Sequence, residues 1–429
     1  MYNADAVANK WSFTKKLFFR FFASYFIVFI FPFPTRFFPV LNILNKWYNS
    51  LFTALVSFTG KNIFHINSSL AATTNGSGDT TFDYIHQLLL LIIAMIAAVT
   101  WSVADRKRKN YNIFLYWLVF YMRYYLGLTM LLYGFEKIIK TQFPFPYYSL
   151  NETYGQSTPM RLLWTFMGYS KTFNVFIGLN QVIAGALVLF RRSTMLGAML
   201  CSFILSNVVL MNFCFDVPVK LFSSNLLLIA VFILVPDANR LADFFLRNKP
   251  VPAAATEPKF SDARMQTIWF VVKFTVIVAV TYLNIVHTIT KNAIQGDAAF
   301  KRTPLFGVYN VEKFVKNNDT SQQVSADPSQ WKSLNIIFPK EATIGMMNDS
   351  IKLYSFFTDT INKKIKLYIH KNSADQSTLT YYLVDSTHLV LNGTLNGDSV
   401  YILLQKQDLN KLPLLNRKFH WINEYPYNK

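Results

Sequence analysis

Seven apolar runs, each long enough to cross a lipid bilayer, constrain this chain more than any other feature of its sequence. They lie at residues 17–34, 84–104, 113–139, 171–190, 193–213, 219–236 and 266–289. The hydrocarbon core of a bilayer is about 30 Å thick, and a helix needs roughly 20 residues to cross it. The sequence therefore predicts an α-helical polytopic membrane bundle of about seven transmembrane helices, in contact with the lipid bilayer.

The composition excludes an ordinary soluble protein. Of the 429 residues, 52% are hydrophobic and 15% are charged, so much of the apolar surface must face lipid. The formal net charge of +19 is carried mainly by short basic clusters beside the apolar runs, a pattern that encodes membrane topology. No soluble segment shows a basic groove with interleaved aromatic residues, and we therefore expect no nucleic-acid partner.

The basic clusters also predict an orientation. They comprise the N-terminal lysines, residues 106–109, Arg191 with Arg192, and the basic residues between 240 and 264. All four fall on one side when the crossings alternate, so the N-terminus is expected in the cytoplasm and the C-terminus outside. The first apolar run follows a basic start and precedes no small-residue cleavage site, which predicts an uncleaved signal anchor.

The connections between the runs differ in character. We expect residues 35–83 to form an exposed outer loop, 140–170 a turn with a helix lying in the membrane interface, and 247–262 an inner linker rich in Pro and Ala. The predicted sections are a signal anchor with outer loop and second helix (1–112), a four-helix core (113–246), an inner linker with the seventh helix (247–290) and a β domain (300–429).

Beyond about residue 300 the hydrophobic pattern changes to alternation, which is typical of strands. Strands are predicted at 334–338, 351–357, 364–369, 379–384, 388–391, 400–404 and 418–422, with turns at Asn392-Gly393 and Asn396-Gly397-Asp398. A C-terminal extracytoplasmic all-β domain, a sandwich or sheet, follows. No catalytic arrangement is visible in it, and His370, His388 and His420 lack metal-ligand spacing, so no metal site is predicted.

The third apolar run carries the most informative polar pattern, Arg123-x3-Gly127-x6-Gly134-x2-Lys137. At about 100° per residue, one helix face presents two glycines between two cations. The glycines predict close contact with a neighbouring helix backbone. Arg123 lies some ten residues, about 15 Å, into its helix, where a charge needs partners.

The partners expected for Arg123 are Asn180, Gln181 and Asn207, with freed backbone carbonyls or a ligand completing the set. Two interpretations remain open for this group, a ligand site and a structural polar cluster. At the outer helix ends, Lys137, Asp216 and Lys220 either line an entrance or anchor the helices in the interface.

Residues 113–246 resemble the DoxX family, small membrane proteins related to the thiosulfate:quinone oxidoreductase subunit DoxD. The resemblance rests on the Arg-Gly-Gly-Lys pattern and on the helix from Gly178, where the family often has Glu at the position of Gln181. The segment from Asn207 through Asn212 and Asp216 to Lys220, and the closing residues 419–426, resemble large DoxX-like proteins of Bacteroidota. Gln181 in place of Glu weakens any proton-transfer role at that position.

The resemblance implies a quinone as ligand and the bacterial inner membrane as location, with the β domain in the periplasm. One functional hypothesis is a quinone-associated redox protein or accessory subunit. The alternative is a noncatalytic envelope component that presents residues 300–429 to partner proteins. A transporter is disfavoured because inverted repeats and broken helix pairs are lacking. The candidate ligand-binding residues are Arg123, Lys137, Asn180, Gln181, Asn207, Asn212, Asp216 and Lys220.

Overall fold

The computed structural model describes residues 10–33, 42–66, 70, 76–150, 154–251, 263–300, 302–317, 330–369, 376–417, 420, 421 and 424. The chain forms two compact units. The helical unit comprises residues 1–139, 158–163 and 170–289, and the barrel unit comprises residues 140–157, 164–169 and 290–429. The membrane-type helical bundle and the C-terminal β domain predicted from sequence are therefore both present.

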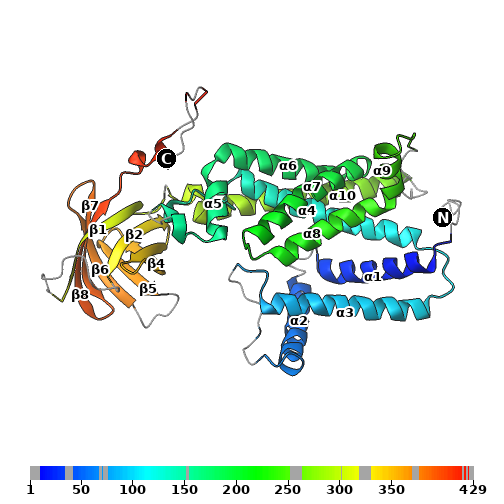
Figure 1. The fold of residues 1–429 in the computed structure, drawn as a ribbon, viewed down its shortest axis with the longest axis horizontal. Coiled ribbons are helices and arrows are strands. Elements are labelled where there is room, and N and C mark those ends of the chain that lie inside the picture. The colour runs from blue at the N-terminus through cyan, green and yellow to red at the C-terminus, as the bar shows by residue number, and fades with distance from the viewer. Residues whose placement is uncertain are drawn as a thin grey trace. The chain divides into compact units, whose positions relative to one another are not determined.

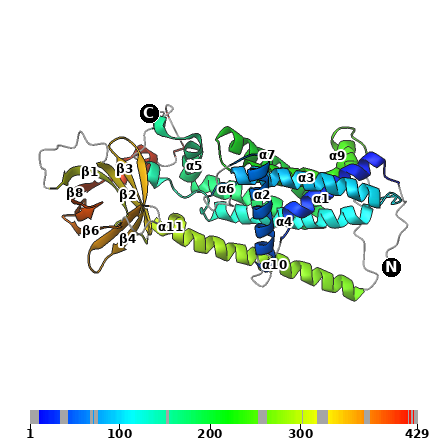
Figure 2. The same ribbon diagram turned by 90° about the horizontal axis from the view of Figure 1, so that it is seen from below.

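The helices of the helical unit pack mainly as antiparallel neighbours along the chain. They are α1 (Phe13–Ile30), α2 (Asn42–Asn62), α3 (Thr81–Ala104), α4 (Asn112–Ile138), α6 (Lys171–Leu189), α7 (Thr194–Cys214), α8 (Lys220–Leu234), α9 (Ala238–Phe245) and most of α10 (Ala263–Gln295). Figure 1 shows α4, α6, α7 and α8 lying alongside one another, and Figure 2 shows α1 beside both α3 and α4. Their contact surfaces are apolar and strongly aromatic, as burial of hydrophobic area requires.

Six helical segments among the described residues are long and apolar enough to cross a membrane. They are Thr81–Ala104, Asn112–Ile138, Lys171–Leu189, Arg191–Cys214, Lys220–Phe245 and Arg264–Phe300, and each overlaps one of the predicted crossings. The first predicted run, 17–34, is helical as α1 but is not among the six. Lys15, Lys16 and Arg20 lie in this 18-residue helix, so its crossing stays a prediction.

The connection 35–83, predicted as an exposed outer loop, is not a loop throughout, because α2 occupies its middle. Three aromatic or aliphatic side chains of α2 recur every fourth residue, Tyr48, Phe52 and Val56, and all three are buried. Phe52 stacks edge-on against His86 of α3 with ring centroids 4.6 Å apart. Polar residues such as Asn45, Lys46 and Asn49 interrupt the apolar residues of this helix, so its sequence shows no apolar run long enough to cross a membrane. The helix predicted within 140–170 is present as α5 (Pro159–Tyr169).

The closest helix pair is α4 with α6, and glycine makes the approach possible. A Cβ atom on Gly134 would lie 2.6 Å from Val182 Cγ2 and 2.9 Å from the Gly178 carbonyl oxygen. A Cβ on Gly185 would lie 2.8 Å from the Gly127 carbonyl oxygen. The predicted role of Gly127 and Gly134 as points of close backbone contact is confirmed, and Gly178 and Gly185 supply the matching face.

The barrel unit closes eight antiparallel strands in the order of the chain, with β1 paired to β8. The strands are β1 (Gly307–Lys316), β2 (Trp331–Phe338), β3 (Glu341–Met346), β4 (Ile351–Asp359), β5 (Lys364–Ile369), β6 (Gln376–Leu383), β7 (His388–Leu395) and β8 (Asp398–Lys406). Alternate residues point inward and fill the interior with a single apolar core that includes Trp331, Leu379 and Leu391. The barrel replaces the predicted sandwich or sheet because pairing of the first and last strands removes both edges.

Six predicted strands are confirmed, whereas β1 and β3 were not predicted and 418–422 falls largely outside the described residues. The turn at Asn396-Gly397 is confirmed, since both residues have positive φ between β7 and β8. The prediction of a turn at Asn392-Gly393 is wrong, because both residues lie inside β7 and pair with residues of β6. A Cβ at Gly393 would lie 2.6 Å from the Thr378 carbonyl oxygen, so this glycine permits close approach of β6.

The segment that follows α4 belongs to the barrel unit. Lys140 is buried, with its Nζ 3.0 Å from Asp297 Oδ2, and it donates to the Gly168 carbonyl oxygen at 2.8 Å. The Phe145 backbone N–H donates to Asp297 Oδ1 at 2.8 Å, just before the short helix α11 (Asp297–Phe300). Lys140 is therefore an internal ion-pair residue at the start of the barrel unit.

Replacing Gly134 by Ala should destabilise the helical unit by about 1–3 kcal/mol, because the added methyl meets backbone atoms of α6 that cannot move independently. The measurement is the thermal melting temperature of the full chain in detergent. Gly155→Ala is the matched control, since no atom would lie within 4 Å of its added methyl group. An unchanged melting temperature for Gly134→Ala would contradict a tight α4–α6 contact.

His388 at the start of β7 should titrate above its ordinary pKa of 6.5. Its Nδ1 lies 2.8 Å from Asp385 Oδ2, and the hydrogen bond to this carboxylate, with the nearby Glu312, raises the pKa. The protonated ring is favoured in the folded barrel, so its contribution to stability is complete below about pH 6.5 and is lost as pH rises through the folded pKa.

NMR titration of histidine ring signals in the full chain tests this expectation. Asp385→Asn should lower the His388 pKa toward 6.5, whereas Asp359→Asn, at the end of β4, should leave it unchanged. A parent pKa at or below 6.5 would show that the Asp385 contact does not hold the proton.

Candidate functional site

Arg123 on α4 is buried, with 2% of its surface exposed. Its Nε donates to the Val188 carbonyl oxygen at 3.0 Å and its Nη2 donates to the Leu189 carbonyl oxygen at 2.9 Å. These carbonyls end α6, where no following helical N–H pairs with them and where the helix dipole is negative. The predicted involvement of freed backbone carbonyls is confirmed. The guanidinium charge is stabilised by the carbonyl groups at the C-terminal end of α6.

The other expected partners lie elsewhere. Gly127 faces Gly185, and Gly134 faces Gly178, so α4 and α6 are antiparallel. Four residues before Gly127 is Arg123, which therefore lies level with Leu189, four residues after Gly185. Gln181 is eight residues away on α6, or about 12 Å. The expectation of matching depth is therefore wrong. Counting residues from the start of α4 placed Arg123 in mid-membrane, but the first eleven residues of α4 extend past the end of α6.

Asn180 and Asn207 do not join a buried polar group. Both are exposed on the surface of the helical unit, and each Nδ2 donates to the carbonyl four residues earlier in its own helix, Phe176 at 3.0 Å and Phe203 at 2.9 Å. Gln181 is buried, and its Oε1 has no hydrogen-bond partner among the described residues. The three amides predicted to share one site are thus divided between the interior and the surface.

Three of the predicted residues, Asn212, Asp216 and Lys220, do come together around the turn between α7 and α8. Asp216 and Lys220 form an ion pair of 2.8 Å across the turn between α7 and α8, and Asn212 Nδ2 donates to Ser223 Oγ at 2.9 Å. Asp79, which no sequence pattern singled out, accepts from the backbone N–H groups of Lys220 at 2.7 Å and Leu221 at 3.0 Å. The cluster therefore caps α8 and ties it to the loop before α3.

Lys137 is buried near the end of α4, next to the buried Glu136. Its Nζ lies 5.8 Å from the centre of the Tyr133 ring, one turn earlier on the same helix. It lies in the last turn of α4, as the sequence predicts, but the contact with an aromatic ring was not expected.

Two buried polar groups were missed altogether. Arg20, in the basic start of the predicted signal anchor, is 2% exposed and donates to Tyr111 Oη, Ser102 Oγ and the Asp105 carbonyl oxygen. Tyr25 donates to Asn225 Oδ1 and accepts from Gln87 Nε2 at 2.6 Å, which joins α1, α3 and α8. No spacing in the sequence relates these residues, because their separations along the chain exceed 60 positions.

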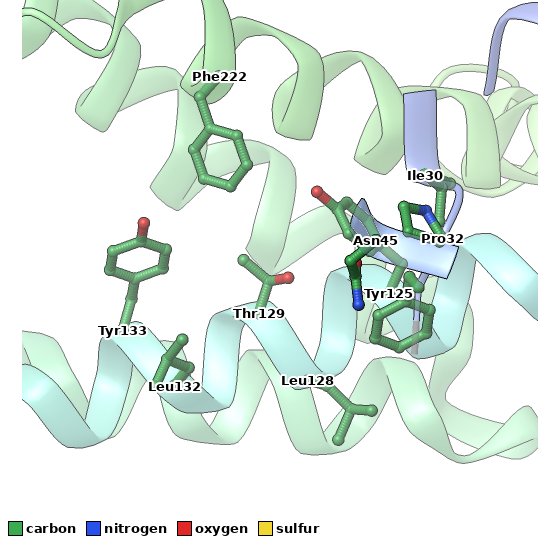
Figure 3. Close-up of a pocket in the computed structure, with 10 residues that line it drawn as sticks. Ile30, Pro32, Asn45, Tyr125, Leu128, Thr129, Leu132, Tyr133 and Phe222 are labelled. Atoms are coloured by element: carbon green, nitrogen blue, oxygen red, sulfur yellow. The ribbon is translucent and has the colours of Figure 1, made fainter. Parts of the chain in front are cut away.

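A cavity of about 190 Å³ lies against the opposite face of α4 from Arg123. Its walls are Ile30, Pro32, Phe33, Asn45, Tyr125, Leu128, Thr129, Leu132, Tyr133 and Phe222, from the end of α1 and from α2, α4 and α8. In Figure 3, Thr129 and Tyr133 project from α4 on the side of Phe222, and Asn45 lies near Tyr125. At about 100° per residue, Tyr125, Leu128, Leu132 and Thr129 share one side of α4.

The cavity has few polar groups, and one is unsatisfied. Asn45 Nδ2 is buried and has no hydrogen-bond partner among the described residues. None of the ten lining residues is charged. A cavity of this kind suits a neutral, mostly apolar molecule that carries a hydrogen-bond acceptor. No group of three or more His, Cys, Asp or Glu residues suitable for a metal ion occurs in the part of the chain that the structure describes.

Arg123→Met should lower the melting temperature in detergent, because the buried carbonyls of Val188 and Leu189 lose charged donors at a cost of about 1–3 kcal/mol. Arg123→Lys should be intermediate, since an ammonium lacks the planar fork that reaches two carbonyls. Arg192→Met, at an exposed position three residues after Leu189, is the control. A parent-like melt for Arg123→Met would mean that other donors, such as Thr194 Oγ1, replace the guanidinium.

Comparison with known proteins gives one informative relative. No family model matches the chain, and no solved structure matches it. The uncharacterized protein YwoB of Bacillus subtilis (strain 168) is 31% identical over 129 residues, which cover 82% of that protein and 30% of this chain. The similarity therefore concerns one part of the chain and nearly all of the relative. At this identity and coverage, the chain belongs to the same protein family as YwoB.

Proposed function

We propose that this membrane protein binds a quinone headgroup in the cavity between α1, α2, α4 and α8. The observation that carries the proposal is the buried Asn45 Nδ2, unpaired among the described residues, in an aromatic cavity without charged walls. A quinone ring is flat and apolar, and its two carbonyl oxygens accept hydrogen bonds. The Asn45 amide and the Thr129 hydroxyl are donors in the lining that such carbonyls require.

The size and walls of the cavity fit one ring. Apolar cavities of about 150 Å³ hold a benzene-sized molecule, and the cavity here measures about 190 Å³. Phe33, Tyr125 and Phe222 provide aromatic surfaces against which a flat ring can pack. An isoprenoid tail would have to continue toward lipid, as a tail attached to a ring of this size exceeds the cavity volume.

This site replaces the one expected at Arg123. The guanidinium already donates to two carbonyls of α6, so the face of α4 that bears Arg123, Gly127 and Gly134 is used for helix packing. The opposite face carries the cavity. A neutral ligand in this cavity therefore suits the helical unit better than a ligand at Arg123.

The resemblance of residues 113–246 to the DoxX family supports a quinone over other flat ligands, because that family is related to a quinone-linked oxidoreductase. On the same grounds we propose the bacterial inner membrane as location, with the N-terminus cytoplasmic and the barrel periplasmic. The name of YwoB states no activity and adds nothing to this choice.

The barrel supports the second hypothesis, an envelope component that presents the domain to partner proteins. Its interior is filled by side chains such as Trp331, Leu334 and Ile402, so its outer surface is the part that can contact another molecule. Large apolar side chains are exposed there on β4 and at the end of β6, including Phe357, Leu383 and the following Val384. The two functions can coexist in one chain, since they use different units.

The test uses the full chain in lipid nanodiscs and the short-tailed benzoquinone decylubiquinone. We expect the parent to be stabilised thermally by the quinone and to carry co-purified quinone detectable by extraction and mass spectrometry. Asn45→Leu and Thr129→Val each remove one donor at nearly constant volume, and each should weaken binding about five- to tenfold.

Thr100→Val is the matched control, since Thr100 is exposed on α3 and its hydroxyl bonds within its own helix. It should bind like the parent. Absence of both co-purified quinone and a thermal shift in the parent would sink the proposal, as would equal binding by Asn45→Leu, Thr129→Val and the control.

A further inference from the structure

Two asparagine amides lie on the exposed face of the helical unit, in the middle of helices that can cross a membrane. Asn180 is the tenth of 19 residues in α6, and Asn207 is the fourteenth of 21 residues in α7. Their neighbours one turn away are large apolar residues that are strongly exposed, Phe176 at 62% and Phe203 at 71%. Amides on such a face would stand in hydrocarbon, where unpaired polar groups are costly.

The hydrogen bonds within the chain leave each amide incomplete. Asn180 Nδ2 donates to the Phe176 carbonyl oxygen and Asn207 Nδ2 to the Phe203 carbonyl oxygen. An amide has two N–H donors and an oxygen that accepts, so each of these side chains retains one N–H and the oxygen beyond the bonds found among the described residues.

The two amides lie at the same depth. Gly197 of α7 packs against Val188 of α6, with its ideal Cβ 2.4 Å from the Val188 backbone nitrogen, and the helices are antiparallel. Eight residues back along α6 is Asn180, and eight residues forward along α7 is Leu205. Asn207 is two residues further, a difference of about 3 Å in height.

We infer that this face is the interface of a dimer of the chain, in which Asn180 of each copy bonds to Asn207 of the other. Two copies inserted in the same direction can be related only by a twofold axis perpendicular to the membrane. Such an axis brings together residues of equal depth, and Asn180 and Asn207 meet that condition. An amide both donates and accepts hydrogen bonds, so Asn180 and Asn207 can complete each other's hydrogen bonds. The twofold axis makes this pair occur twice in the dimer.

The surrounding side chains fit the same arrangement. Exposed apolar residues flank both asparagines, Phe176 and Ile183 on α6 and Phe203 and Leu210 on α7. They would pack around the amides and exclude lipid from them, while the small Ser202 and Ser206 bond back to their own helix. The inference does not depend on the quinone proposal, because the dimer face is formed by α6 and α7, and neither helix lines the cavity.

The experiment measures the monomer–dimer equilibrium of the full chain in vesicles by single-molecule photobleaching at increasing lipid dilution. The parent should dimerise, and the double variant Asn180→Leu with Asn207→Leu should raise the dissociation constant about tenfold. Thr100→Leu, on the exposed face of α3, should leave it unchanged. A monomeric parent, or a dimer indifferent to the double variant, would overturn the inference.

Cross-linking gives a second readout that does not remove the asparagines. In a background with Cys201→Ser and Cys214→Ser, the pair Ile183→Cys and Phe203→Cys places thiols at equal depth beside the amides. Oxidation should give a band of twice the mass containing this chain alone. A cross-link to a different polypeptide, or none, would contradict the dimer, and melting temperatures verify that each variant is folded.

Discussion

The contact between α4 and α6 is the constraint on which the rest of the helical unit depends. Four glycines, Gly127 and Gly134 on one helix and Gly178 and Gly185 on the other, let the two backbones touch. Because helix packing in lipid gains little from hydrophobic burial, such close van der Waals contact is a main source of association. The contact also fixes the register, and the register decides which polar groups meet.

Two consequences follow from that register. Arg123 lies level with the last carbonyls of α6. Its guanidinium, which would be costly in hydrocarbon, donates hydrogen bonds to two of these carbonyls. The opposite face of α4, with Tyr125 and Thr129, is left to α1, α2 and α8, which do not fill the space completely. The position of the cavity is therefore set by a packing contact on the far side of the same helix.

The buried polar groups of the helical unit are mostly matched between helices that are distant in sequence. Arg20 with Tyr111, and Tyr25 with Gln87 and Asn225, join α1 to α3, α4 and α8. In a low-dielectric interior each such group is costly when unpaired, so these networks specify one arrangement of helices. Groups without a partner among the described residues, such as Asn45 Nδ2 in the cavity and the side-chain oxygen of Gln181, are conspicuous for that reason.

The sequence by itself determined the division into an apolar helical part and a β part, six of the crossings, six of the strands and the packing role of the glycines. These follow from local periodicity, which a chain displays in one dimension. It could not show α2, in which polar residues interrupt the apolar ones, nor barrel closure, which depends on pairing β1 with β8 nearly 100 residues away. The tertiary structure alone decided that Arg123 faces the end of α6, that Asn180 and Asn207 face outward and that Asn45 borders a cavity. The depth of a residue, and the direction in which its side chain points, depend on how each helix is placed against its neighbours. That placement is set by contacts between side chains and backbones of different helices.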